Sequence, residues 1–176
     1  MKTIATTERL LMREMTPGDA ENAFRLNADP EVIHYTGDTA FASIEAAREF
    51  LSNYSDYLRN GFGRWALELR EDNTFIGWCG LKKLQDGEVD LGYRLMRPFW
   101  GKGYATEAAR ECLRIGFERF ALGTIIGRTA KFNSGSVRVL EKVGMRYWKT
   151  DVCDHDPEAL YYRIDRMTWE RSERTA

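Results

Sequence analysis

Hydrophobic and polar residues alternate through the middle of the chain in the pattern that is typical of β-strands. Between Glu88 and Met96 the apolar residues take every second position, and charged residues or glycine take the others. Trp65 to Leu69 alternate in the same way, and an apolar run from Phe75 to Leu84 lies between these two segments. Asp72-Asn73 and Asp86-Gly87 are turn sequences at the two junctions. The pattern therefore predicts three consecutive antiparallel strands.

Helices are predicted in four segments. One runs from about Asp19 to Asn27, and a second is capped by Ser43, continues to about Asn60 and stops at Gly61. Another begins at Asn133. The helix that starts at Tyr104 has the clearest period, because its apolar face recurs every three or four residues at Ala105, Ala108, Ala109, Cys112, Leu113, Gly116, Phe117 and Phe120.

The remaining pattern completes a mixed layer architecture. Further strands are predicted at Glu8 to Met15, Thr124 to Ala130, Met145 to Val152 and Leu160 to Met167, and the tail from Glu170 to Ala176 is expected to fray. Strands and helices do not alternate in a long series, so a doubly wound parallel sheet is not expected. The chain has 176 residues, of which 43% are hydrophobic. We therefore expect residues 1–176 to form a single α/β domain of the α+β type.

The segment from Trp100 to Ala109 carries the strongest chemical signal, because two glycines flank a lysine directly before a helix. Gly101 and Gly103 can adopt φ > 0 and expose backbone amides. The helix start adds unpaired N–H groups and partial positive charge. A phosphorylated ligand is therefore the first candidate, and an ordinary tight turn before a helix is the alternative.

Two nucleotide-binding motifs do not fit this segment. A P-loop requires G-x-x-x-x-G-K-[ST], and no Lys-Ser or Lys-Thr follows a glycine at that spacing. A dinucleotide fingerprint requires a third glycine three residues after the second. Gly103 is followed by Tyr104, Ala105 and Thr106, so that glycine is missing. Neither of these nucleotide-binding motifs therefore accounts for the glycine segment.

Composition excludes several classes of partner and site. The formal net charge is −1, so no general attraction to nucleic acid or to an anionic membrane is expected. The absence of a long apolar stretch and of a signal-peptide core predicts a cytoplasmic location. Cys79, Cys112 and Cys153 lack metal-binding spacing and are expected to be buried thiols. His34 and His155 are too few for a zinc site, so no metal is expected.

Two motifs resemble the GNAT superfamily of N-acetyltransferases. Trp100-Gly101-Lys102-Gly103-Tyr104-Ala105 resembles its acetyl-CoA pyrophosphate loop, [Q/R]-x-x-G-x-[G/A], except at the first position. Tryptophan at that position, together with the segment from Asn133 to Met145, resembles the branch that acetylates the N-termini of ribosomal proteins. Thr7 to Arg13 and Asp29 to Val32 also resemble segments of the family, so that the resemblance covers nearly the whole chain.

The resemblance implies a fold and a binding site for acetyl-CoA. It implies a mixed, mostly antiparallel sheet of about seven strands that splays after the fourth, the Glu88 strand, with about four helices. The pantetheine arm would lie in the splay and pair with the backbone at Leu95, Met96 and Arg97, and a backbone N–H near Met96 would meet the carbonyl oxygen. The other cofactor-binding residues implied are Gly101, Lys102, Gly103, Tyr104, Ala105, Asn133 and Ser136.

Three side chains are candidates for the chemistry of acetyl transfer. Asp90 lies ten residues before the loop, where many members of the family carry a carboxylate that acts as a base, and Glu88 shares its strand face. The alternative is that both are solvated carboxylates facing a lysine or an arginine. The resemblance implies that Ser136 donates a hydrogen bond toward the sulfur of CoA, while Asn133 both contacts the cofactor and caps its helix.

The leading hypothesis is an acetyl-CoA-dependent N-acetyltransferase that acts on a protein N-terminus or a small-molecule amine. A CoA-binding sensor without chemistry and a nucleotide-binding protein are the alternatives. The acceptor side is expected to form from Asp29 to Ala42 and from the segment around Cys153 to Tyr162. No nucleic-acid or membrane partner is expected, and a homodimer is possible because it is common among the members that the chain resembles.

Overall fold

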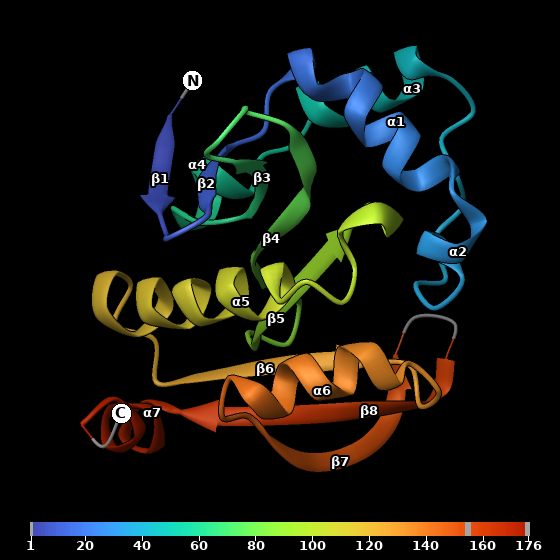
Figure 1. Ribbon diagram of the computed structural model, residues 1–176. Helices are drawn as coiled ribbons and strands as arrows, with labels where there is room; N and C mark the ends of the chain where they lie inside the picture. Colours follow the sequence, from blue (N-terminus) through green and yellow to red (C-terminus); the bar gives the residue numbers. More distant parts are fainter. Residues whose placement is uncertain (1, 154–155, 175–176) are drawn as a thin grey trace.

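The computed structural model of the chain describes residues 2–153 and 156–174. Within them the strands form one eight-stranded sheet in the order β1-β2-β3-β4-β5-β6-β8-β7 (Figure 1). Every neighbouring pair is antiparallel except β5 and β6, which are parallel. This confirms a mixed, mostly antiparallel sheet. The strands are β1 (Thr3–Thr6), β2 (Leu10–Glu14), β3 (Arg64–Leu69), β4 (Phe75–Lys83), β5 (Val89–Leu95), β6 (Thr124–Thr129), β7 (Arg146–Cys153) and β8 (Asp156–Asp165).

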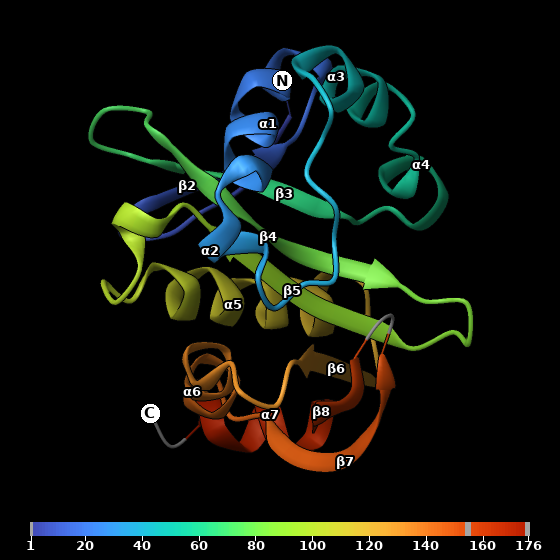
Figure 2. The ribbon, with the colours of Figure 1, turned by 90° about the vertical axis from the view of Figure 1, so that its right-hand side faces the viewer.

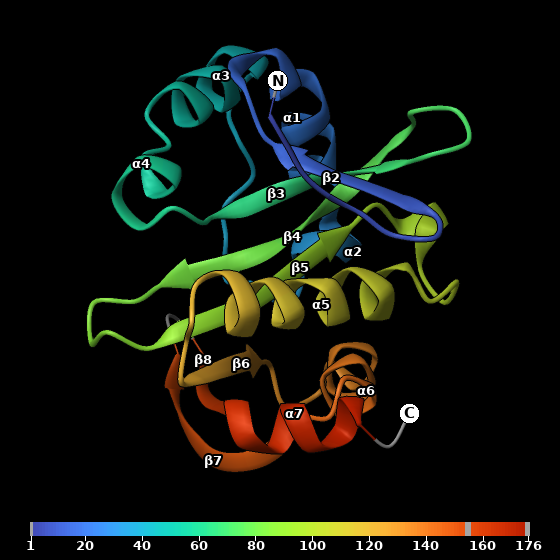
Figure 3. The same ribbon diagram turned by 90° about the vertical axis from the view of Figure 1, so that its left-hand side faces the viewer.

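Helices cover both faces of the sheet because the strands of its first half present apolar residues on both sides. Leu67 of β3 belongs to the main core together with Ala109 and Leu113 of α5, which runs along β4 and β5 (Figure 3). Its neighbour Ala66 faces the other way and packs with Leu26 of α1. The α-helices are α1 (Ala20–Ala28), α2 (Pro30–Ile33), α3 (Ile44–Ser52), α4 (Asp56–Asn60), α5 (Tyr104–Arg114), α6 (Ser134–Lys142) and α7 (Arg166–Glu173).

The two halves of the sheet separate between β5 and β6, as the resemblance implied. Parallel pairing is confined to Asp90 opposite Ile126, and the two strands then diverge (Figure 2). On its other edge β5 stays paired with β4 as far as Leu95 opposite Gly77. The second half of β5 therefore has a neighbouring strand on one edge only. The splay follows the fifth strand rather than the fourth, because the pattern did not predict β1.

Helix α2 was not predicted, and α5 ends at Arg114, followed by the wider turn Ile115–Arg119, although its apolar face was expected to reach Phe120. Three other elements differ from the prediction, each for a local reason. The helix predicted from Ser43 to Asn60 is divided into α3 and α4, although Ser43 caps it and Gly61 ends it as expected. The division lets the Tyr54 hydroxyl accept the Arg64 amide of β3 at 2.8 Å. Strand β1 is short and half exposed, so that it shows no alternation.

The third difference lies at the end of the chain, where the strand predicted to reach Met167 stops at Asp165. Asp165 then caps α7, and its carboxylate accepts the Thr168 amide at 2.8 Å. Trp169 of this helix is buried and stacks on Phe117, with ring centroids 5.2 Å apart. The expectation of a frayed tail is therefore wrong for residues 170–173, while residues 175–176 lie outside the described part.

A buried ion network joins β2, β3 and the turn η1 (Pro17–Asp19) that leads into α1. Arg13 donates to Asp19 at 2.6 and 2.9 Å and to Glu68 at 2.6 and 2.8 Å. All three residues are less than a tenth exposed. Burial alone would raise the pKa of Asp19, but hydrogen bonds from Arg13 and from the Thr16 amide outweigh it and hold the pKa below its usual value. The network fixes α1 against the sheet.

Candidate active site

The glycine loop, defined as Trp100 to Ala105, has the backbone geometry that its sequence predicts. It follows the short turn η2 (Arg97–Phe99), and both of its glycines have positive φ, 73° at Gly101 and 84° at Gly103. Gly103 is the N-cap residue of α5 and offers no side chain to the helix start. The first N–H groups of α5 are therefore available to a ligand, as an anion site at a helix N-terminus requires.

Arg9, which the sequence did not single out, holds this loop in place. From the turn between β1 and β2 it donates to the Lys102 carbonyl at 3.0 Å and to Glu107 of α5 at 2.7 Å. Its guanidinium also lies 4.4 Å from the centre of the Tyr104 ring. Lys102 itself is exposed, with its ammonium 5.6 Å from the Phe99 ring. The loop is therefore anchored through its backbone while its lysine points to solvent.

Trp100 ties the loop to the end of β5. Its indole N–H donates to the Leu95 carbonyl at 2.7 Å, although 45% of the residue is exposed. The position that departs from the superfamily pattern thus has a structural role. The Leu95 carbonyl, which was expected to face a pantetheine arm, therefore already accepts one of the two hydrogen bonds that a carbonyl oxygen can take.

The pairing of β4 with β5 determines which backbone N–H groups near Met96 are open. The Met96 N–H donates to the Ile76 carbonyl at 2.8 Å and is not available to a carbonyl oxygen. Because backbone groups point to alternate edges along a strand, residues one position away point to the opposite edge. The N–H groups of Tyr93 and Leu95 therefore face the splay. Arg97 is exposed and pairs with Asp29 at 3.4 Å.

Two hydroxyl groups meet at the splay. The Tyr93 hydroxyl lies 2.9 Å from the Ser136 Oγ and donates to the Ser136 carbonyl at 2.9 Å. Asn133 caps α6 by accepting the Ser136 amide at 3.0 Å, which confirms its structural role. Burial raises the pKa of Tyr93, and the bond with Ser136 opposes this only in part. Tyr93 therefore stays protonated at neutral pH. The alternation predicted Tyr93 as a strand residue but did not predict its contact with Ser136.

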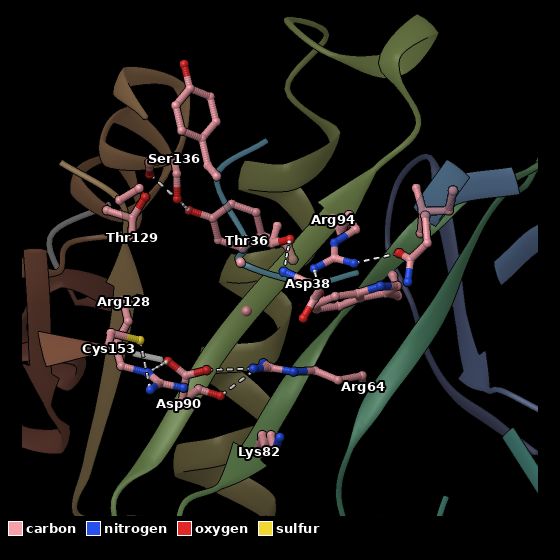
Figure 4. A pocket seen from close by; sticks show the side chains of 18 of the residues that line it. Thr36, Asp38, Arg64, Lys82, Asp90, Arg94, Arg128, Thr129, Ser136 and Cys153 are labelled. Carbon is pink, nitrogen blue, oxygen red and sulfur yellow. Dashed lines mark hydrogen bonds and ion pairs between the residues drawn. The ribbon is translucent and has the colours of Figure 1, made fainter. Parts of the chain in front are cut away.

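Asp90 is buried and lies between two arginines (Figure 4). Its Oδ2 accepts from Arg64 at 2.6 Å, and its Oδ1 accepts from Arg128 at 3.2 Å. Gly92 makes room for this arrangement, because a Cβ there would lie 2.6 Å from the Arg64 guanidinium. Asp90 thus faces arginines, as the alternative interpretation proposed, but it is not solvated. Glu88 precedes β5 and does not line the cavity beside Asp90, so the structure does not bring the two together.

A cavity of about 790 Å³ lies over this face of β5 and reaches Asn133 and Ser136. Its walls include residues 34–39 after α2 and residues 156–157 at the start of β8, from the two segments expected on the acceptor side. Arg94 lines it four residues beyond Asp90, and pairs with Asp38 while donating to the Asn27 side chain at 2.6 Å. Cys153 also lines it and accepts from Arg128 at 3.1 Å. Cys79 and Cys112 are fully buried, as predicted, whereas Cys153 is only partly buried, in contrast to the expectation.

Two features of the described residues bear on membrane and metal binding. No helix within residues 2–153 and 156–174 is long and apolar enough to cross a membrane. In the same residues no group of three or more histidines, cysteines or carboxylates is placed to hold a metal ion.

Comparisons with known proteins agree on one family. The family model described as "Acetyltransferase (GNAT) domain" matches residues 9–146. The uncharacterized protein YkkB of Bacillus subtilis (strain 168) is 34% identical over 168 residues, which cover 92% of this chain and 96% of that protein. The FsC-acetyl coenzyme A-N(2)-transacetylase of Aspergillus fumigatus is 28% identical over 187 residues, covering 96% of this chain and 78% of that protein. The crystal structure of a GNAT-family acetyltransferase from Bacillus anthracis has a TM-score of 0.78 and 28% identity, covering 94% of this chain and 99% of that one.

Proposed function

Because the chain belongs to the GNAT family of acetyltransferases, we propose that it transfers an acetyl group directly from acetyl-CoA to the nitrogen of a primary amine. The observation that carries this proposal is the position of Ser136. It lies at the splay of the sheet, bonded to Tyr93, and it also lines the cavity that reaches over Asp90. A thioester in the splay and an amine in the cavity would meet at this point.

The residues present fit acetyl-CoA, which supplies the activated acetyl group when bound. The exposed amides of the glycine loop and the N-terminus of α5 suit a pyrophosphate. The unpaired edge of β5 at Tyr93 and Leu95 suits the amide groups of the pantetheine arm, as an added strand pairs with a sheet edge. Lys102 adds a charge that remains in solvent.

The reaction requires two proton movements around one exchange of bonds. The acceptor nitrogen bonds to the acetyl carbon and loses a proton, while the carbon–sulfur bond breaks and the sulfur gains a proton. We assign the proton for sulfur to the Ser136 hydroxyl, which Tyr93 orients through the contact between their oxygens, and Ser136 regains its proton from water. Burial raises the pKa of Tyr93, so Tyr93 orients Ser136 as a neutral hydroxyl and is not itself the proton source. The Tyr93 N–H at the open edge would meet the carbonyl oxygen.

Asp90 is proposed to position Arg64 and Arg128 rather than to act as the base. A proton on either of its oxygens would break one of its two ion pairs. A strong base is not needed for every acceptor. Freeing a lysine-type amine of its proton at pH 7 costs about 4.6 kcal/mol, whereas an α-amine with a pKa of about 8 costs about 1.4 kcal/mol. We therefore propose an α-amine acceptor that passes its proton to water.

The test is release of CoA from acetyl-CoA with a panel of amino acids, peptides and polyamines. Ser136→Ala should lower kcat about 100-fold, the lower end of what a positioned proton donor contributes, because a thiolate is already a stable leaving group. Tyr93→Phe should lower kcat about tenfold, the equivalent of one hydrogen bond. Ser134→Ala is the matched control, because Ser134 begins the same helix and does not line the cavity.

Two outcomes would overturn the proposal. If no amine of the panel releases CoA above the hydrolytic background while CoA still binds, the chain is a CoA-binding module without transfer activity. If Ser136→Ala retains the kcat of Ser134→Ala, the hydroxyl pair is structural. Resemblance to the branch that acetylates ribosomal proteins keeps peptide N-termini in the panel.

A further inference from the structure

The cavity, called the acceptor cavity from here on, has an unusual charge balance for a pocket that receives an amine. Its walls carry Arg64, Lys82, Arg94 and Arg128 against Asp38, Asp90 and Asp156, so basic side chains outnumber acidic ones. Asp90 is shared by two arginines, and among the described residues Lys82 has no ion-pair partner. A polycationic amine would enter against this charge, whereas an amine that also carries an anionic group would not.

Arg94 has a buried N–H group in this cavity that no hydrogen bond within the described part of the chain uses. Its side chain is 10% exposed, and its Nη1 and Nη2 donate to Asn27 and Asp38. Its Nε is buried and has no hydrogen-bond partner among the described residues. The Nε and Nη2 groups form one edge of a guanidinium, and a carboxylate that binds this edge normally takes both N–H groups. Asp38 therefore occupies half of a two-point carboxylate site.

Asp38 is placed so that it can leave this site. It lies in the segment between α2 and α3, directly after Gly37, whose φ is 68°. Its side chain is 50% exposed, so the carboxylate can turn fully into water, where hydration replaces the ion pair. Arg94 in contrast is held by Asn27 and by the Trp78 ring, 5.3 Å from its guanidinium. The receptor is fixed, and the carboxylate on it is replaceable.

We propose that the acceptor is an amine that bears a carboxylate, and that this carboxylate replaces Asp38 on the Nε and Nη2 edge of Arg94. An α-amino acid is the simplest compound with both groups. Its carboxylate would satisfy the buried Nε, which Asp38 leaves without a partner. The inference rests on the proposed acetyl transfer and deepens it, because Arg94 then determines which amines are acetylated.

The first experiment compares each protein amino acid with its own amide in the CoA-release assay. The amide has the more reactive nitrogen, because the adjacent carboxylate of an amino acid favours the protonated amine. Intrinsic reactivity therefore favours the amide, and the proposal predicts the reverse. We expect at least one amino acid to have a KM about 100-fold lower than that of its amide, the worth of two charge-assisted bonds.

Variants of Arg94 and Asp38 separate substrate recognition from a structural role. Arg94→Gln should raise the KM for the amino acid about 100-fold, and Arg94→Lys about tenfold because the charge remains but the two-point edge is lost. Neither should change the KM for the amide more than about twofold. Asp38→Asn should lower the KM for the amino acid, because it removes a competing carboxylate. Arg25→Gln, an exposed change on α1, is the matched control.

A measurement without turnover keeps the inference separate from the proposed function. The same amino acid should stabilise the unmodified protein against heat in the presence of CoA, and it should fail to stabilise Arg94→Gln. A loss of amino-acid affinity in Asp38→Asn, or equal changes for amino acid and amide in Arg94→Gln, would show that the Arg94–Asp38 pair is structural and would overturn the inference. Absence of turnover with every amine would instead contradict the proposed function.

Discussion

The glycine loop and the acceptor cavity are built in opposite ways. The loop is a run of consecutive residues, with φ of 73° at Gly101 and 84° at Gly103, and its proposed binding of CoA uses backbone groups. The cavity is built from side chains of separate segments, such as Asp38 after α2 and Arg94 on β5. A site made of consecutive backbone groups leaves a motif in the sequence, whereas a site made of distant side chains leaves none.

The two sites also differ in how they are anchored. Both anchors are arginines near β2, but Arg9 bonds to the loop at an exposed position, with its side chain 42% exposed. Arg13 is buried and holds Asp19, directly before α1, together with Glu68 on β3. The acceptor side therefore depends on a dehydrated ion network, and the glycine loop depends on a pair whose arginine is exposed and whose carboxylate is 17% exposed.

The largest expected effect comes from breaking the buried anchor. Arg13→Ala should lower the free energy of unfolding by about 3–5 kcal/mol, because Asp19 and Glu68 remain buried without a counter-charge. Urea unfolding measures this value. Arg9→Ala is the paired change and should cost no more than about 1 kcal/mol, as exposed ion pairs do. Equal losses for the two variants would contradict the contrast between the anchors.

Acid titration gives a second readout of the same network. The pKa of Asp19 is lowered in the folded chain, so its contribution to stability is complete above the unfolded value of about 3.9. This contribution is lost as the pH falls through the lower, folded value. In Arg13→Ala the bonds from Arg13 that lower this pKa are absent, so the contribution should disappear. If the free energy of unfolding falls with pH in the same way in both proteins, the pKa of Asp19 does not depend on Arg13.

A smaller effect is expected from straining the glycine loop. Gly103→Val places a branched side chain at a φ of 84°, which costs about 1–3 kcal/mol, so the Kd for CoA should rise roughly tenfold to hundredfold. Calorimetry with CoA measures this change. Gly87→Val is the matched control, since Gly87 has a φ of 90° in the turn between β4 and β5. It should cost similar stability and leave the Kd unchanged, and an equal rise in both would exclude a local role for the loop.

The contrast between consecutive residues and distant side chains also explains which parts of the structure the sequence could predict. The alternation before Leu95 and the period after Tyr104 predicted β5 and α5, because burial on one face imposes those periods. Strand β1 was not predicted, because a half-exposed edge strand has no alternation of apolar and polar residues. The roles of Arg64 and Arg128 beside Asp90 could not be predicted, because they depend on which strands become neighbours. The resemblance to the family identified Ser136 as a candidate, but only the structure shows that its hydroxyl contacts that of Tyr93.

The smallest expected effect tests whether the loop binds through its backbone alone. Lys102 is exposed, and its carbonyl rather than its ammonium is bonded to Arg9. Lys102→Ala should therefore raise the Kd for CoA only about twofold to fivefold, the range of an exposed charge pair, and this difference should vanish at high salt. The measurement is the Kd for CoA at low and high ionic strength. A loss as large as that of Gly103→Val would place the binding energy in the side chain and contradict a site made of backbone amides.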